Sequence, residues 1–362
     1  MTKFDIISAD SHTMEPGDLW LKYIEPKYKE KSPRVIRKDD TDVFYCEGVN
    51  LLPIGAVGAV NKKPEEIRRE GRFDKDIRKG GWDPHERRKD MEADGVEAEV
   101  LYPTFAMRMF AVKDADFQRA LFQAYNTWVK DYCSYYPDRL KALGMIPLND
   151  IEVGIGEMKR CKELGLCGAM IAISASEDKD YGSKTFDPFW AAAQELDMPV
   201  SLHILTESKP PSQISWADGA TVHVHIQRSL ANMVFGGVFY RFPKLKVISA
   251  ENDAGWAAHY LQHMDYIFVK RRNIRHMDIP FTTPPSEYFR RGVYLTFMRD
   301  LSVVPMREKV GVDNLMWASD YPHQDSTWPH SQEMIHKLFD GIPAAERRKM
   351  VAENAAKLYA FN

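Results

Sequence analysis

Cysteine is scarce in this sequence. Only Cys46, Cys133, Cys161 and Cys167 occur among 362 residues, and no two of them form a C-x-x-C pair. Cysteines this sparse in a long chain argue for free thiols rather than a disulfide framework. The missing C-x-x-C pair also argues against a metal site built from thiolates.

Long apolar runs and an excess of one charge are missing as well. No apolar stretch approaches the roughly 20 residues of a membrane span, and the N-terminal Met1–Asp5 segment lacks the apolar centre of a signal peptide. Lys and Arg number 49 against 52 Asp and Glu, a net charge of −3 that offers nucleic acid no basic surface. We therefore expect a cytosolic protein that binds neither membranes nor nucleic acid and acts on a small molecule.

The sequence does contain enough apolar residues for a large core, at 44% of the chain. They gather in eight short, nearly continuous runs, typical of parallel strands buried on both faces. These runs are Phe4–Ala9, Val96–Tyr102, Leu140–Ile146, Cys167–Ile173, Pro199–His203, Leu245–Ala250, Val293–Phe297 and Leu315–Ser319. Amphipathic segments between them predict helices at Asp116–Tyr135, Ile151–Leu164, from Asp187, and at Gln227–Arg241, Trp256–Lys270 and Ser331–Phe339.

Strands that alternate with helices in this way predict an α/β fold, the (β/α)8 TIM barrel. An open doubly wound sheet with a cap is the alternative. It would need a glycine-rich phosphate loop after the first strand, where this chain has Asp10-Ser11-His12-Thr13. The barrel is therefore the preferred fold, as a single domain over residues 1–362.

A barrel needs about 250 residues, so part of the chain must be insertion. Residues 13–83 form the largest one, and the Val43–Cys46 run before a turn near Gly48 predicts a β-hairpin there, followed by a solvated charged stretch. The connection Ile204–Ile226 carries Pro210-Pro211 and two histidines, His223 and His225, and is long enough to be an active-site lid.

Ligand-type side chains follow four of the predicted strands. Asp10 and His12 lie at the end of the first, His203 ends the fifth, Glu251 follows the sixth, and Asp320 with His323 follows the eighth. Two residues apart on a strand, Asp10 and His12 point to the same side. Each residue alone has a simpler explanation, such as a turn, a core histidine or a helix cap. Together they predict a site for a divalent transition metal (zinc, iron or manganese, one or two ions) at the catalytic end of the barrel.

Several motifs along the chain resemble those of the amidohydrolase superfamily, in particular the branch that includes aminocarboxymuconate semialdehyde decarboxylase. The motifs are Ser8–His12 with Glu15-Pro16, Trp82-Asp83-Pro84, Asp94-Gly95-Val96, Leu101-Tyr102-Pro103, Phe242–Val247, Ser319–His323, Ser326–Pro329 and Glu353–Tyr359. They span nearly the whole chain. The resemblance implies metal ligands at Asp10, His12, His203 and Asp320, and a homodimer.

One position departs from that family pattern. In decarboxylases of the branch, the segment at strand six follows the pattern K-V-x-x-A-H-G. In this chain Lys246–Asn252 reads K-V-I-S-A-E-N, so Glu251 stands where the pattern has a histidine. This replacement favours metal-dependent hydrolysis of an amide, ester or thioester. In that hypothesis Asp320 binds metal and accepts a proton from water, while Glu251 binds a second ion or acts as general acid. A structural ion pair is the other interpretation of Glu251.

Two other functions stay open. The alternative enzyme is a nonoxidative decarboxylase of an aromatic or unsaturated acid, with His323, His223 or His225 as proton donor. The third hypothesis is a barrel that only binds a ligand, which the retained metal ligands disfavour. Rim residues predicted to contact substrate are Tyr102, Arg108, Phe297, Arg299 and Trp328, which suit a bulky apolar or aromatic group and its negative charge.

Overall fold

The computed structural model describes residues 2–47, 49, 53–175, 179–206, 215–274 and 282–361. Eight parallel strands form one sheet, in the order β1-β4-β5-β6-β7-β8-β9-β10. Their bounds are β1 Ile7–His12, β4 Ala98–Tyr102, β5 Leu140–Met145, β6 Gly168–Ala172, β7 Val200–His203, β8 Val247–Ala250, β9 Val293–Phe297 and β10 Leu315–Trp317. All eight predicted strands are confirmed.

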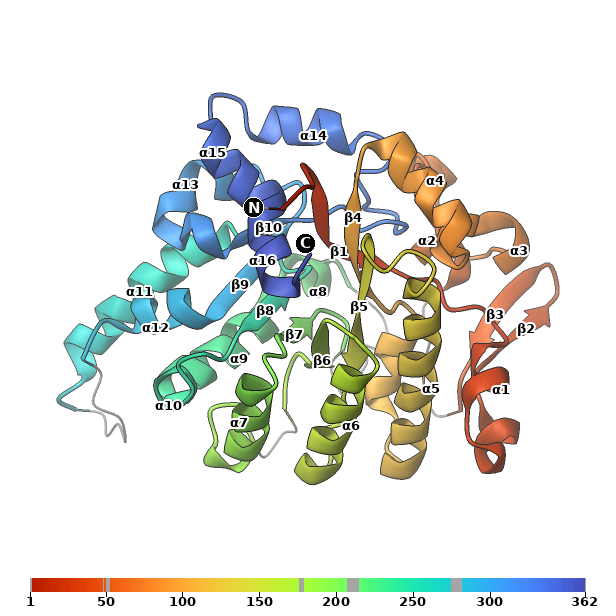
Figure 1. Ribbon diagram of the computed structural model, residues 1–362, viewed down its shortest axis with the longest axis horizontal. Helices are drawn as coiled ribbons and strands as arrows, with labels where there is room; N and C mark the ends of the chain where they lie inside the picture. The colour runs from red at the N-terminus through yellow and green to blue at the C-terminus, as the bar shows by residue number, and fades with distance from the viewer. Residues whose placement is uncertain are drawn as a thin grey trace.

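The first and last strands meet and bring the sheet nearly to closure. The amide of Asp320 donates to the carbonyl of Asp10 at 3.0 Å, and the amide of His12 donates to the carbonyl of Tyr321 at 2.6 Å. These bonds join the two ends of the strand order into a TIM barrel (Figure 1).

Helices surround the barrel (Figure 1). The α-helices are α1 Leu19–Tyr23, α2 Ile54–Val57, α3 Phe73–Asp76, α4 Pro84–Asp94, α5 Ala115–Cys133, α6 Ile151–Glu163, α7 Asp187–Glu195, α8 Trp216–Ala220, α9 His223–Phe235, α10 Val238–Arg241, α11 Trp256–Arg271, α12 Pro285–Gly292, α13 Val303–Val310, α14 Ser331–Leu338, α15 Ala344–Arg348 and α16 Asn354–Tyr359. Short 3-10 turns include η4 Ala106–Ala111, and a π-helical turn covers Lys349–Glu353. No helix among the described residues is long and apolar enough to cross a membrane.

Capping residues determine where several helices begin and end. The Asp83 carboxylate accepts from the amides of His85 and Glu86 at the start of α4, where Pro84 takes the first helical position. The predicted helix Gln227–Arg241 is wrong as one element. It is divided into α9 and α10 at Gly237, whose φ of 77° lies in the left-handed region.

The segment 13–83 leaves the barrel after β1. It contains an antiparallel pair, β2 Arg34–Lys38 and β3 Thr41–Tyr45, which lies beside α1 in Figure 1. The buried Phe44 ring stacks on Phe105 at a centroid distance of 4.5 Å and so packs the hairpin against the loop after β4. The predicted turn at Gly48 lies outside the described residues.

Candidate metal centre

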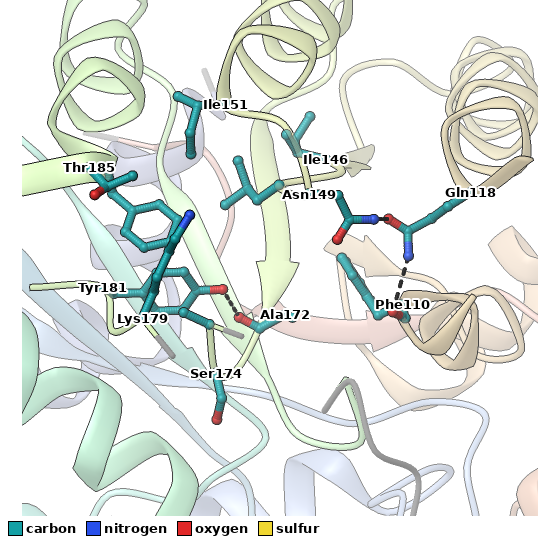
Figure 2. Close-up of a pocket in the computed structure, with 13 residues that line it drawn as sticks. Phe110, Gln118, Ile146, Asn149, Ile151, Ala172, Ser174, Lys179, Tyr181 and Thr185 are labelled. Atoms are coloured by element: carbon teal, nitrogen blue, oxygen red, sulfur yellow. Dashed lines mark hydrogen bonds between the residues drawn. The ribbon is translucent and has the colours of Figure 1, made fainter. Parts of the chain in front are cut away.

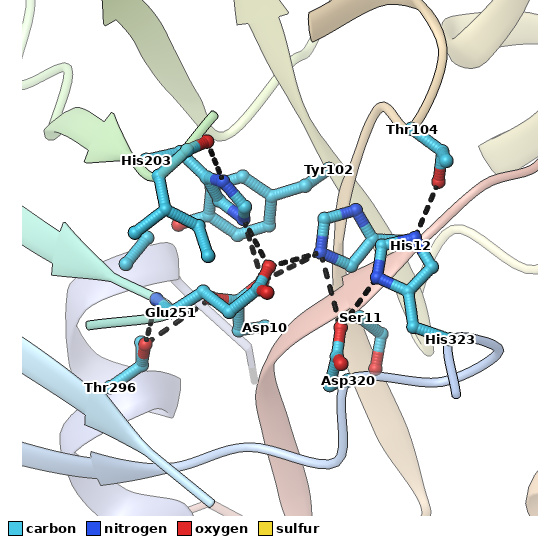
Figure 3. A network of polar contacts seen from close by, with 12 residues as sticks. Asp10, Ser11, His12, Tyr102, Thr104, His203, Glu251, Thr296, Asp320 and His323 are labelled. Atoms are coloured by element: carbon cyan, nitrogen blue, oxygen red, sulfur yellow. Dashed lines mark hydrogen bonds and ion pairs between the residues drawn. The ribbon is translucent and has the colours of Figure 1, made fainter. Parts of the chain in front are cut away.

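Five side chains converge at the C-terminal end of the barrel (Figure 3). Each has a buried polar atom without a hydrogen-bond partner: Asp10 Oδ1, His12 Nε2, His203 Nε2, Glu251 Oε2 and Asp320 Oδ1. We refer to these as the five donor atoms. Leaving so many buried polar atoms unpaired is costly unless a cation satisfies them. All five were predicted from the sequence as metal ligands, and their role as ligands stays a prediction.

The spacing of the donor atoms suits metal binding. His12 Nε2 lies 3.5 Å from Asp10 Oδ1, 3.4 Å from Glu251 Oε2 and 3.4 Å from Asp320 Oδ1. His203 Nε2 lies 3.1 Å from Glu251 Oε2 and 3.7 Å from Asp10 Oδ1. Ligands about 2.1 Å from an ion and at right angles to one another are about 3 Å apart. The donor atoms therefore lie close enough to hold a divalent metal, in two overlapping groups: His12, Glu251, Asp320 and His323, and Asp10, His12 and His203.

Hydrogen bonds orient both imidazoles toward this point. His12 Nδ1 lies 2.8 Å from the carbonyl oxygen of Pro103, and His203 Nδ1 lies 2.9 Å from that of Ile204. A carbonyl only accepts, so each Nδ1 carries the hydrogen, and in the neutral ring Nε2 holds a lone pair. This is the arrangement in which protein histidines bind metal through Nε2.

The electrostatics of the centre call for positive charge. Burial alone would lower the pKa of His12, but contacts with Asp10 and Glu251 outweigh it and raise the pKa to about 9. Burial also acts to lower the pKa of His203, but the same two carboxylates outweigh it, and this pKa is raised. For Asp10 and Glu251, burial is outweighed by the two imidazoles, and their pKa values fall. Without metal, the protonated imidazoles supply the positive charge that the carboxylates require. A bound metal cation would supply that charge instead.

Two of the carboxylates sit on unusual backbone. Glu251 has φ 54° and Asp320 has φ 53°, in the left-handed region where a residue with a Cβ costs about 1–2 kcal/mol. In the strand register His203 is level with Ala250, the residue before Glu251. The left-handed residue after β8 turns the chain sharply, so that Glu251 reaches the imidazole of His203. Strain of this kind is typical of functional sites.

His323 and Thr104 extend the network beyond the donor atoms (Figure 3). His323 Nδ1 lies 2.9 Å from Asp320 Oδ1, and its Nε2 lies 2.9 Å from the hydroxyl of Thr104. Burial, then the neighbouring His12, lowers the pKa of His323 to about 3, so this ring is neutral. Glu15 fixes the backbone of this loop, because its carboxylate accepts from the amides of Thr104 and Phe105.

Several supporting residues escaped the sequence analysis. Thr296, on β9, donates from its hydroxyl to Asp10 Oδ2 at 3.2 Å and accepts from the amide of Glu251 at 2.9 Å. Arg87, on α4, donates to the carbonyl of His12 at 2.6 Å and to Glu99 Oε2 at 2.6 Å. Threonines and buried arginines carry no ligand signal in a sequence, although Glu15 lay within a recognised motif.

The five residues predicted to bind substrate lie in different surroundings. Tyr102 is buried, with its ring 5.0 Å from that of His203, and Arg108 is buried and donates to the carbonyl of Leu205. Arg299 donates to the carbonyl of Ser326. Phe297 is buried beside Phe339, and the indole of Trp328 donates to the carbonyl of Asp90. Tyr102 therefore packs against donor residues, and substrate contact by any of the five stays a prediction.

A cavity of about 220 Å³ lies at the ends of β5 and β6 (Figure 2). Phe110, Ile146 and Phe186 supply apolar walls, while Asn149 and Lys179 supply polar groups. Asn149 donates to Gln118, which in turn donates to the carbonyl of Phe110. None of the five donor residues lines this cavity.

The predicted lid is described only in part. Residues 207–214, with Pro210-Pro211, lie outside the described residues, and α8 with the start of α9 forms the rest of the connection. His223 and His225 are in the first turn of α9, where His225 is exposed and His223 half-buried. Their roles stay open.

Among known proteins, curated relatives that are similar to this chain are named as decarboxylases. A gamma-resorcylate decarboxylase from Polaromonas sp. is 24% identical over 299 residues, covering 75% of this chain and 86% of the relative. A 2-amino-3-carboxymuconate-6-semialdehyde decarboxylase from Dictyostelium discoideum is 29% identical over 186 residues, covering 50% and 51% of the two chains. The preference for hydrolysis drawn from the sequence is therefore wrong. That preference rested on Glu251, which stands where decarboxylases of the branch have a histidine.

Solved structures share the fold, and a family model matches most of the chain. An amidohydrolase from Mycobacterium avium subsp. paratuberculosis has a TM-score of 0.81 at 20% identity and covers 99% of this chain and 98% of its own. A dihydroxybenzoic acid decarboxylase from Polaromonas sp., solved with manganese and 2-nitroresorcinol, has a TM-score of 0.68 at 18% identity, with 99% and 98% covered. The amidohydrolase family model matches residues 74–361, and this chain belongs to that family.

Proposed function

We propose that this protein is a metal-dependent nonoxidative decarboxylase, a carbon–carbon lyase, of an aromatic or unsaturated carboxylic acid. The observation that carries the proposal is the convergence of five buried donor atoms at the catalytic end of a TIM barrel. The decarboxylases among its relatives, and the manganese in one structural neighbour, support the reaction class and favour manganese as the ion.

The side chains of the centre would have different roles in such a reaction. Asp10, His12, His203, Glu251 and Asp320 would hold the cation. When bound, a divalent cation polarises the substrate carboxylate and a neighbouring oxygen. Cleavage of the carbon–carboxylate bond leaves its electron pair on the substrate carbon, which then takes up a proton as carbon dioxide departs.

Asp320 and His323 are the pair that we propose to hold and move that proton. His323 Nδ1 lies 2.9 Å from Asp320 Oδ1, and Thr104 holds the opposite ring nitrogen. Through these two contacts His323 positions Asp320, and the pair would carry the proton to the substrate. Tyr102, whose ring lies beside His203, is the rim residue that we propose to contact the substrate. Assembly as a homodimer and residence in the cytosol stay predictions of the sequence.

The test is carbon dioxide release by the manganese-loaded protein. Substrates to compare are 2,6-dihydroxybenzoate, 5-carboxyvanillate and 2-amino-3-carboxymuconate-6-semialdehyde, since proteins similar to this chain are named for them. We expect release from one of these acids that chelator abolishes and manganese restores. Asp320→Asn should lose activity by about 100-fold or more. Retained activity in Asp320→Asn, or in the chelated protein, would contradict the proposal.

A further inference from the structure

Glu251 differs from the other four donor residues in its exposure. Its side chain is 23% exposed, whereas those of Asp10, His12, His203 and Asp320 are between 0 and 4% exposed. Glu251 is therefore the member of the set whose side chain meets solvent, although its Oε2 is buried. The side chains of the other four are enclosed by protein.

Glu251 is also the least tethered of the five. Each imidazole is fixed through Nδ1, Asp10 is fixed through its second oxygen by Thr296, and Asp320 lies against His323. Among the described residues, the only polar partners of the Glu251 carboxylate are the two imidazoles that share the centre. Thr296 holds the Glu251 backbone but not its side chain. Rotation about side-chain bonds alone can move the carboxylate away.

Charge gives a reason for such movement. Three carboxylates and a divalent cation leave a formal charge of −1 on the centre, which repels an anionic acid. If the carboxylate of the acid replaces that of Glu251 on the ion, the formal charge of the ion and its bound ligands stays at −1. If the acid binds in addition to Glu251, that charge becomes −2. The donor set thus accepts an anionic ligand at lower electrostatic cost when one of its own carboxylates leaves.

We propose that Glu251 is an exchangeable ligand that closes the metal centre in the resting protein and yields its position to the carboxylate of the incoming acid. This inference rests on the proposed function, because it requires the metal centre. It assigns to Glu251 the role of a gate for anionic substrates, distinct from the four permanent ligands.

Crystal structures of the whole protein, with Mn²⁺ alone and with Mn²⁺ plus 2,6-dihydroxybenzoate as probe, test the exchange directly. We expect Glu251 Oε2 within about 2.2 Å of the ion without the probe, and turned away from it when the probe is bound. Glu251 on the ion in both structures, or in neither, overturns the exchange. If the wild-type protein fails to take up Mn²⁺, the proposed function is overturned with it.

Binding measurements on Glu251→Gln provide a second readout. We expect weaker Mn²⁺ binding, by about tenfold, together with tighter binding of the probe to the loaded protein, by about fivefold. Asp253→Asn is the matched control, because it removes a charge two residues away without removing a donor atom. It should leave the Mn²⁺ affinity within about twofold. If Glu251→Gln binds both Mn²⁺ and the probe more weakly, Glu251 is a permanent ligand and the proposal is overturned. If its Mn²⁺ affinity is unchanged, Glu251 is not a ligand, and the proposal is overturned as well.

Discussion

At the scale of single residues, the hydroxyl of Thr296 serves two of the five donor residues at once. It donates to Asp10 and accepts from the amide of Glu251. Neighbours that orient metal ligands in this way matter for affinity although they never touch the ion. Such neighbours come from strands that carry no ligand of their own, here β9, and this is why the sequence did not reveal Thr296.

Thr296→Val tests this support with almost no change in side-chain volume. It leaves the Glu251 amide and Asp10 Oδ2 without their partner, and we expect Mn²⁺ affinity to fall by about 10- to 100-fold. Isothermal titration calorimetry measures the change. Thr327→Val is the control, since Thr327 is equally buried but bonds to Ser331 in the loop after β10. An equal loss in both variants would show a general packing effect.

The histidines make the stability of the metal-free protein depend on pH. The pKa of His12 is about 9 in the folded protein and 6.5 ordinarily, and that of His203 is also raised. Protonation therefore stabilises the fold fully below about pH 6.5, and this contribution is lost as pH rises through 9. For His12 it amounts to at most about 3 kcal/mol.

Urea unfolding of chelator-treated protein at pH 6.5 and 9 measures this dependence. We expect a lower free energy of unfolding at pH 9, and a smaller difference in His12→Asn, whose amide can still donate to the Pro103 carbonyl. Bound Mn²⁺ should remove the decline, because the imidazoles are then neutral at both values. A metal-free protein equally stable at pH 6.5 and 9 would be inconsistent with this account of the centre.

At the scale of elements, α4 holds β1 in place through one buried arginine. Arg87 is fully buried, bonds to the backbone of His12, and pairs with Glu99 on β4. Removing one partner of a buried ion pair leaves the other charge uncompensated, which typically costs 3–5 kcal/mol. Arg87 therefore links α4 both to β4 and to β1, the strand that carries two donor atoms.

Arg87→Met should accordingly lower the free energy of unfolding by about 3–5 kcal/mol, measured by urea denaturation. Arg88→Met on the same helix is the control and should cost less than about 1 kcal/mol, because its ion pair with Glu92 is exposed. The double variant Arg87→Met, Glu99→Gln should recover part of the loss. No recovery would mean that the contact with His12, rather than the charge pair, carries the stability.

The sequence predicted the barrel strands better than the helix boundaries or the backbone conformation at the site. All eight barrel strands were found, because strands buried on both faces appear as continuous apolar runs. The helix boundary at Gly237 was missed, since the left-handed conformation there is not marked by any change in apolar spacing. The donor residues were found because parallel strands all end on the same side of the sheet. Their left-handed backbone at Glu251 and Asp320 depends on tertiary context and could not be predicted.

At the scale of the whole molecule, the donor atoms come from β1, β7 and the loops after β8 and β10, so a bound ion would crosslink the barrel. Binding to the folded state alone raises stability by about 2.7 kcal/mol at a ligand concentration 100 times the Kd. We expect Tm to rise with Mn²⁺ in wild-type protein and in Asp253→Asn. Differential scanning calorimetry should show no rise in Asp10→Asn, and a rise in that variant would place the ion elsewhere.

The bonds that close the barrel have a consequence for biosynthesis. Asp10 and His12 are made about three hundred residues before Asp320, which bonds to the backbone of Asp10. Until the segment with Asp320 docks, the nascent chain offers only a partial set of ligands. Binding of metal by the full set therefore requires that the two ends of the strand order have already met.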